Sequence, residues 1–234
     1  MPGHFDARPV WALILATASS VALASAGSPH GDAGARIASA GTPDGATACA
    51  SCHGPRGEGM GAFPHLAGSG ASYLREQLEA FASGKRKNPI MQPIAQALSP
   101  EQRAQVTGYY AGLPPAVAAT DREARSRSDT GAWLATRGRW EDGLPACAQC
   151  HGPGGIGVGA SFPPLAGQPA AYLAEQLKAW QTGARPPGPL GLMEGIARKL
   201  KDGDIQAVSD YYAGLPAAIA SGPAPVTAVK KAAP

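Results

Sequence analysis

Aromatic and charged side chains are scarce in this chain of 234 residues. Aromatic residues make up 6% and charged residues 16%, whereas 31 glycines and 23 prolines interrupt the sequence. The length suits one large domain or two small ones, and small domains bury a modest share of their surface and often need a cofactor, metal or disulfide to be stable. The composition therefore indicates that a bound group, a metal or disulfides complete the core.

A dense patch of one charge is also missing. The formal net charge is +3, and the only basic run is Lys85-Arg86-Lys87. Nucleic-acid binding requires a larger basic surface, so this class of function is excluded. We interpret the run as a solvated helix end, which at most steers the encounter with a charged partner.

Long hydrophobic runs are absent after the N-terminus. An apolar run from Val10 to Ala18 continues through serines to Ala24-Ser25-Ala26, a small-x-small cleavage site. We predict a signal peptide over residues 1–26, which would send a soluble mature protein out of the cytoplasm. The alternative is an uncleaved anchor, for which the 17 residues from Val10 to Ala26 are marginally long.

The chain has only four cysteines, and all of them fall in two C-x-x-C-H motifs, at residues 49–53 and 147–151. This motif is the attachment signature of c-type haem. Two cysteines three residues apart lie on one side of a helical turn, where both thiols can add to the vinyl groups of one porphyrin. The adjoining histidine then supplies the proximal iron ligand. The motifs predict two haem c groups, with covalent attachment at Cys49, Cys52, Cys147 and Cys150 and proximal ligation by His53 and His151.

Other uses of the cysteines fit the pattern less well. A disulfide within C-x-x-C closes a strained small ring that contributes little stability. A four-cysteine zinc site leaves each histidine unexplained, and a thioredoxin-like redox pair needs a βαβ context that is absent.

The motifs belong to an internal repeat in which residues recur at offsets of 98 to 102. Phe63-Pro64 recurs as Phe162-Pro163, and Tyr109-Tyr110 recurs as Tyr211-Tyr212. We therefore predict one domain at residues 33–115 and a second at residues 130–216. A charged linker (116–129) separates them, and an Ala/Pro/Lys-rich flexible tail (217–234) follows.

Apolar residues in each copy follow helical spacing. The pattern predicts helices over Ser72 to Ala82 and Ala171 to Trp180, each stopped by a glycine, Gly84 or Gly183. Ser99-Pro100-Glu101 has the signature of a helix start, and Asp202 or Asp204 is the candidate cap in the second copy. Because no period-2 pattern is evident, we predict an all-α fold.

The sixth iron ligand is predicted from the repeat. Met91 and Met193 occupy equivalent places, each followed by x-x-Ile-Ala, about 40 residues after the motif histidine. A lone methionine is usually an adaptable core residue, but its recurrence in both copies favours axial ligation. We read Met60, which has no counterpart, as loop packing.

Three further predictions concern residues near the motifs. His65, whose counterpart is Pro164, is expected at the surface or on the propionate side of the haem, and His30 in an inert flexible stretch. A carbonyl in the loop of Pro64 or Pro163 is expected to accept the Nδ1 proton of the proximal histidine and orient its ring.

These motifs resemble the diheme cytochrome c family typified by cytochrome c4, over residues 33–216. The resemblance implies two tandem class I cytochrome c domains, each wrapped around a covalently attached haem, with His53/Met91 and His151/Met193 ligation. It also implies electron transfer in the bacterial periplasm, from a membrane quinol-oxidising complex to a terminal oxidase. The segment Ala184 to Pro189 replaces the basic Lys85 to Asn88 stretch, so the docking faces of the copies are expected to differ.

The leading hypothesis is an electron carrier, because a methionine-ligated haem has no open site for a small-molecule substrate. Peripheral association with a membrane partner is compatible with it. Two alternatives stay open: a haem subunit held by a dehydrogenase or oxidase, and a diheme enzyme such as a peroxidase or a thiosulfate-oxidising cytochrome.

Overall fold

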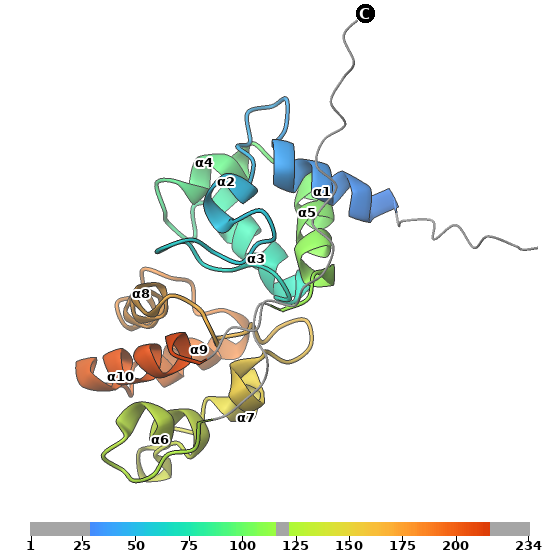
Figure 1. Ribbon diagram of the computed structural model, residues 1–234. Helices are drawn as coiled ribbons and strands as arrows, with labels where there is room; N and C mark the ends of the chain where they lie inside the picture. Colours follow the sequence, from blue (N-terminus) through green and yellow to red (C-terminus); the bar gives the residue numbers. More distant parts are fainter. Residues whose placement is uncertain (1–28, 116–121, 216–234) are drawn as a thin grey trace, which may run out of the picture.

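The structure is a computed structural model that describes residues 29–115 and 122–215, and its regular structure there is helical (Figure 1). The first segment contains α1 (Pro29–Ala40), α2 (Ala50–His53), α3 (Ala71–Ala82), α4 (Met91–Gln96) and α5 (Pro100–Gly112). The second contains α6 (Thr130–Thr136), η1 (Trp140–Asp142), α7 (Ala148–His151), η2 (Pro153–Gly155), α8 (Ala170–Gln181), η3 (Pro189–Gly191), α9 (Leu192–Ala197) and α10 (Asp202–Ala213).

Several predicted segments fall outside these residues. The predicted signal peptide (1–26), the predicted tail (217–234) and residues 116–121 of the predicted linker are not described. The predicted domain limits remain predictions, although α1 begins at Pro29, ahead of the expected start. His30 lies within α1, a helix that the sequence analysis did not predict.

The helices form two lobes that follow the sequence repeat (Figure 1). The N-terminal lobe is residues 29–115 and the C-terminal lobe is residues 122–215. In the first, α1 packs on α5 and α3 packs on α4 and α5; in the second, α6 packs on α10 and α8 packs on α9 and α10. The all-α prediction is confirmed, since the described residues contain isolated β-bridges but no strand.

Glycine permits a close helix crossing in each lobe. A Cβ at Gly34 would lie 2.3 Å from the carbonyl oxygen of Gln105 on α5. The equivalent Gly131 would place its Cβ 2.2 Å from the carbonyl oxygen of Ala207 on α10. These contacts are too short for any side chain, so the first and last helices of each lobe depend on glycine for their packing.

The predicted helix limits agree closely with the structure. α3 and α8 cover the predicted segments, and Gly84 and Gly183 follow them with φ of +74° and +73°. Ser99 caps α5 by accepting the N–H of Gln102, whose side chain in turn accepts the N–H of Ser99. The prediction for α10 is wrong, because Lys201 is the N-cap residue and Asp204 instead accepts the N–H of Lys201.

Apolar cores are small in both lobes. In the N-terminal lobe the buried cluster is Ile37, Ala38, Ala46, Leu74, Leu98, Val106 and Tyr110. The C-terminal lobe has one cluster around Tyr211 and Val208 and another around Leu134 and Ile205. None of the described helices has the length and apolar character of a membrane span. The thin cores agree with the prediction that a bound group completes each lobe.

Candidate haem sites

Each C-x-x-C-H motif forms a single helical turn. Cys49 is the N-cap residue of α2, and the N–H of His53 donates to its carbonyl oxygen at 2.9 Å. Cys147 caps α7 in the same way, with 2.9 Å between the N–H of His151 and its carbonyl oxygen. The turn therefore presents both cysteines and the histidine of a motif to one side, as two vinyl groups and an iron of one porphyrin require.

The first thiol of each motif is not poised for redox chemistry. All four cysteines are free, and burial raises the pKa of Cys49 and raises the pKa of Cys147 to about 11. A thioredoxin-like pair needs a cysteine with a depressed pKa. The raised pKa of the first cysteine in each motif, Cys49 and Cys147, therefore argues against a catalytic dithiol.

A prolyl carbonyl orients each motif histidine. Nδ1 of His53 lies 2.7 Å from the carbonyl oxygen of Pro64, and Nδ1 of His151 lies 2.8 Å from that of Pro163. A carbonyl only accepts, so Nδ1 carries the proton and Nε2 keeps a lone pair for a metal. Burial lowers the pKa of both histidines, which favours the neutral ring. The prediction that these carbonyls accept the Nδ1 protons is confirmed.

The two repeated methionines face the same space as the motifs. Met91 begins α4 and Met193 lies in the first turn of α9, and both line the cavity that the cysteines and histidines also line. The N–H groups of Ile90 and Met91 donate to Oδ1 of Asn88, which holds the start of α4. Met60 does not line the cavity and is 48% exposed, so its assignment to loop packing is wrong.

One cavity of about 1320 Å³ joins the two lobes. Its walls are mostly apolar and include Leu74, Phe81 and Val106 of the N-terminal lobe and Leu173, Trp180 and Val208 of the C-terminal lobe. A typical site for one ligand has a volume of about 300–1,000 Å³. The size of the cavity, and the cysteines, histidine and methionine that each lobe contributes to its walls, therefore fit two porphyrins.

A ring of polar side chains crosses the boundary between the lobes inside this cavity. Arg86 donates to Oε1 of both Gln77 (2.8 Å) and Gln176 (2.6 Å). Arg185 donates to the same two oxygens, at 2.9 Å for Gln77 and 3.2 Å for Gln176. Each guanidinium also reaches a tyrosine of the opposite lobe, since Arg86 donates to Tyr172 and Arg185 to Tyr73.

The sequence analysis missed this ring. Arg86 is 7% exposed, so the interpretation of Lys85-Arg86-Lys87 as a solvated run is wrong for its central residue. Arg185 is 4% exposed. The available signal was the repeat itself, because the arginines, glutamines and tyrosines each recur at an offset of 99.

Two buried guanidinium groups share the same acceptors, and neither has an ion-pair partner in the described part of the chain. Burying a charge without a counter-charge is costly, and two like charges held close together cost more. Haem brings two propionate carboxylates, which are anionic at neutral pH. The chemistry of this ring therefore fits haem as the group that fills the cavity.

His65 joins the lobes and is not at the surface. It is 3% exposed, and its Nε2 lies 3.0 Å from the carbonyl oxygen of Ala166. Its backbone N–H donates to Oε1 of Gln168, and Nε2 of Gln168 donates back to the carbonyl of His65. The surface reading of His65 is wrong, because three hydrogen bonds to the C-terminal lobe bury it beside the cavity.

We expect the protein to lose stability in mild acid through His65. Burial lowers its pKa from 6.5 to about 4, so the folded state binds this proton less readily than the unfolded state. The stabilisation is complete above pH 6.5 and is lost as the pH falls towards 4. Between pH 7 and about 4.5 the loss is about 2 kcal/mol, at about 1.4 kcal/mol per pKa unit.

Urea unfolding at these two pH values measures the effect. The variant His65→Gln is the control, because its amide can donate to Ala166 but does not titrate in this range. The wild type should lose about 2 kcal/mol more than the variant over this interval. Equal losses in the two proteins would contradict the assignment.

Comparison with known proteins decides the family. The family model described as cytochrome c matches residues 32–113 and 144–215. The chain belongs to the cytochrome c family. Each lobe carries one of the matches, and each match contains one C-x-x-C-H motif.

Three relatives narrow this assignment. A thiosulfate dehydrogenase electron acceptor of Stutzerimonas stutzeri is 51% identical over 172 residues, 73% of this chain and 80% of that protein. The reduced cytochrome c4 of Pseudomonas stutzeri superposes with a TM-score of 0.66 at 32% identity, over 79% of this chain and 97% of that one. The thiosulfate dehydrogenase TsdBA of Marichromatium purpuratum superposes with a TM-score of 0.72 at 42% identity, over 82% of this chain but 41% of that longer chain.

The chain is thus a diheme cytochrome c of the cytochrome c4 type. It has two tandem class I cytochrome c domains and two haem c groups with iron, and it is an electron carrier. The resemblance to cytochrome c4, the tandem fold and the cofactor predicted from the sequence are confirmed. The buried arginine ring lies between the two cytochrome c domains.

Proposed function

We propose that this cytochrome accepts electrons from a thiosulfate dehydrogenase, with the iron held by His53 and Met91 in the N-terminal lobe and by His151 and Met193 in the C-terminal lobe. In this proposal Cys49, Cys52, Cys147 and Cys150 form the thioether bonds. The histidine geometry supports it, because Nε2 is the free nitrogen in both lobes. Each haem supplies a one-electron site.

The protein residues bind and tune the haems. The Pro64 and Pro163 carbonyls fix the rings of the proximal histidines, and the apolar walls exclude water from the metal. Met91 and Met193 would close the sixth positions, and the positive charge of Arg86 and Arg185 favours the reduced state of a nearby haem. These features suit outer-sphere electron transfer, in which no substrate reaches the iron.

The partner is proposed from the comparisons. The relative named as a thiosulfate dehydrogenase electron acceptor is 51% identical, whereas the cytochrome c4 of Pseudomonas aeruginosa is 36% identical over a similar length. A second protein with the same name, from Thiomonas intermedia, is 43% identical. This difference in identity is the main support for a thiosulfate dehydrogenase as the electron donor. It favours the hypothesis that the chain is the electron-transfer component of a dehydrogenase.

We place the cytochrome in the periplasm, after removal of residues 1–26, and propose that it passes electrons onward to a terminal oxidase. The second candidate donor is a membrane quinol-oxidising complex, which the similarity to cytochromes c4 favours. The two candidates differ in the protein that reduces the haems.

Reduction kinetics separate the two donors. Oxidised cytochrome is mixed with thiosulfate and the purified dehydrogenase that the Stutzerimonas stutzeri relative serves, and the haem absorption is followed. Both haems should become reduced only when enzyme and thiosulfate are present together. A quinol-oxidising complex with its quinol is the parallel assay. Rapid reduction by that complex, with none by the dehydrogenase, would overturn the proposal.

A further inference from the structure

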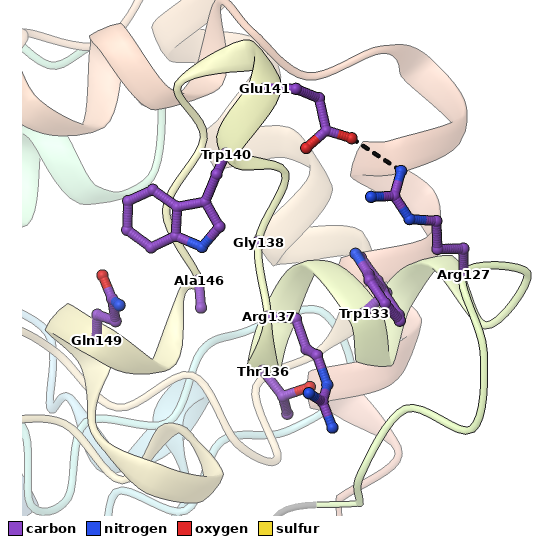
Figure 2. A pocket seen from close by; sticks show the side chains of 9 residues that line it. All are labelled: Arg127, Trp133, Thr136, Arg137, Gly138, Trp140, Glu141, Ala146 and Gln149. Atoms are coloured by element: carbon purple, nitrogen blue, oxygen red, sulfur yellow. Dashed lines mark hydrogen bonds and ion pairs between the residues drawn. The ribbon is translucent and has the colours of Figure 1, made fainter.

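The C-terminal lobe has an exposed aromatic pocket that the N-terminal lobe lacks. Its volume is about 450 Å³, and Trp133, Trp140, Arg127, Arg137, Glu141 and Gln149 line most of it. Figure 2 shows the indole of Trp140 on the side of Gln149 and Ala146, and that of Trp133 between Arg127 and Arg137. The pocket is formed by α6, η1 and the start of α7.

Trp140 is an unusual surface residue. It lies in η1 and is 60% exposed, although tryptophan normally buries most of its large apolar surface. Tryptophan and arginine are enriched among the residues that contribute most to protein–protein binding. A folding role does not require such exposure, so the side chain is available to a partner.

The charge of the pocket is positive. The guanidinium of Arg127 lies 5.3 Å from the ring centre of Trp133 and pairs with Glu141, whereas that of Arg137 lies 5.8 Å from the same ring. Arg137 has no ion pair within the described residues, so its charge is not compensated there. An acidic surface on the partner would complement this charge.

The pocket adjoins the haem attachment turn. Gln149 lies on α7 between Cys147 and Cys150, and Ala146, just ahead of the motif, lines both this pocket and the large cavity. A haem attached at Cys147 and Cys150 would therefore lie in the cavity next to this pocket. A protein seated there would be close to the cofactor, and electron transfer depends on close approach.

The repeat provides an internal comparison. Gly41 and Gly138 hold equivalent positive-φ positions ahead of the two motifs, and the segment that follows in the N-terminal lobe, Thr42 to Ala48, has no aromatic residue. Trp133 corresponds to the exposed Arg36, and Arg137 corresponds to Ala40. The pocket is therefore specific to the C-terminal lobe.

We propose that the Trp133–Trp140 pocket is the docking surface for the thiosulfate dehydrogenase, which contacts it with an acidic patch and delivers electrons to the C-terminal haem. This inference rests on the proposed function. It assigns entry of electrons to one lobe and leaves the N-terminal lobe to pass them on.

The test compares Trp140→Ala and Arg137→Ser with the control Arg36→Ser, which removes one positive charge from the equivalent face of the N-terminal lobe. Binding of oxidised cytochrome to the dehydrogenase is measured by calorimetry without thiosulfate, and reduction is followed with thiosulfate. Trp140→Ala should weaken binding and lower the second-order rate about tenfold or more. Arg137→Ser should lower the rate and flatten its dependence on salt.

Haem spectra, midpoint potentials and thermal stability should be unchanged in all three variants, and Arg36→Ser should bind and react as the wild type does. Wild-type binding and rates in both pocket variants would overturn the docking site while leaving the proposed function intact. Equal slowing by Arg36→Ser and Arg137→Ser would overturn the docking site as well. The rate would then depend on the net charge of the cytochrome and not on a charge at this pocket. Failure of the dehydrogenase to reduce the wild type would contradict the proposed function and the partner named here.

Discussion

Replacing Cys49 and Cys52 together with serine is expected to give a chain that carries one haem. The two attachment turns lie in separate lobes, so loss of one pair leaves the other intact. The double variant Cys147→Ser/Cys150→Ser is the matched counterpart and should also retain one haem. The intact mass of each variant should fall short of the wild type by about one haem, beyond the sulfur-to-oxygen changes.

Stability should fall with the haem count. Each lobe has a thin apolar core, and part of the lining of the 1320 Å³ cavity would lose its packing partner. Thermal unfolding of either variant should begin at a lower temperature than that of the wild type, because one lobe has lost the haem that fills its side of the cavity. A double variant with two covalent haems, or with none, would contradict the assignment of attachment sites.

Features set by local sequence were predictable. The attachment turns, α3, α8 and the capped start of α5 depend on residues within a few positions of one another. The prolyl carbonyls that orient His53 and His151 lie 11 and 12 residues away, in a loop that the repeat marks twice. Comparison of the two copies within one chain showed which residues recur, as an alignment of related sequences normally does.

Contacts between the lobes could not be predicted in the same way. The acceptor that Arg86 shares in the other lobe is 90 residues away, and the carbonyl that His65 reaches is 101 residues away. When the group that buries an arginine comes from another domain, the residues next to that arginine in the sequence do not show whether it is buried or solvated. Arg86 was misplaced for this reason, and the surface alternative for His65 was wrong because no histidine recurs at its position in the second copy to guide the prediction.

Met91 and Met193 are the residues that decide whether both haems have a closed sixth position, as an electron carrier requires. Both line the cavity and lie in the first turn of equivalent helices, α4 and α9. We expect Met91→Ala and Met193→Ala each to remove about half of the ferric Fe–S(Met) charge-transfer band, since one of two haems loses its thioether ligand. The midpoint potential of that haem should fall, because axial ligands set haem potentials over a range of about 0.8 V and methionine raises them.

Carbon monoxide provides an independent measurement, since it binds ferrous haem only where the sixth position is open. Each single variant should bind one carbon monoxide per chain and the double variant two, while the wild type binds none. Met60→Leu is the control, because Met60 is exposed and lies outside the cavity, and it should behave as the wild type does. If one of the single variants kept the full band and bound no carbon monoxide, the methionine in that lobe would not be the ligand. The haem in that lobe would then have a different sixth ligand. Because the axial ligand sets the midpoint potential, the two haems would differ in potential and therefore in their roles in accepting and passing on electrons.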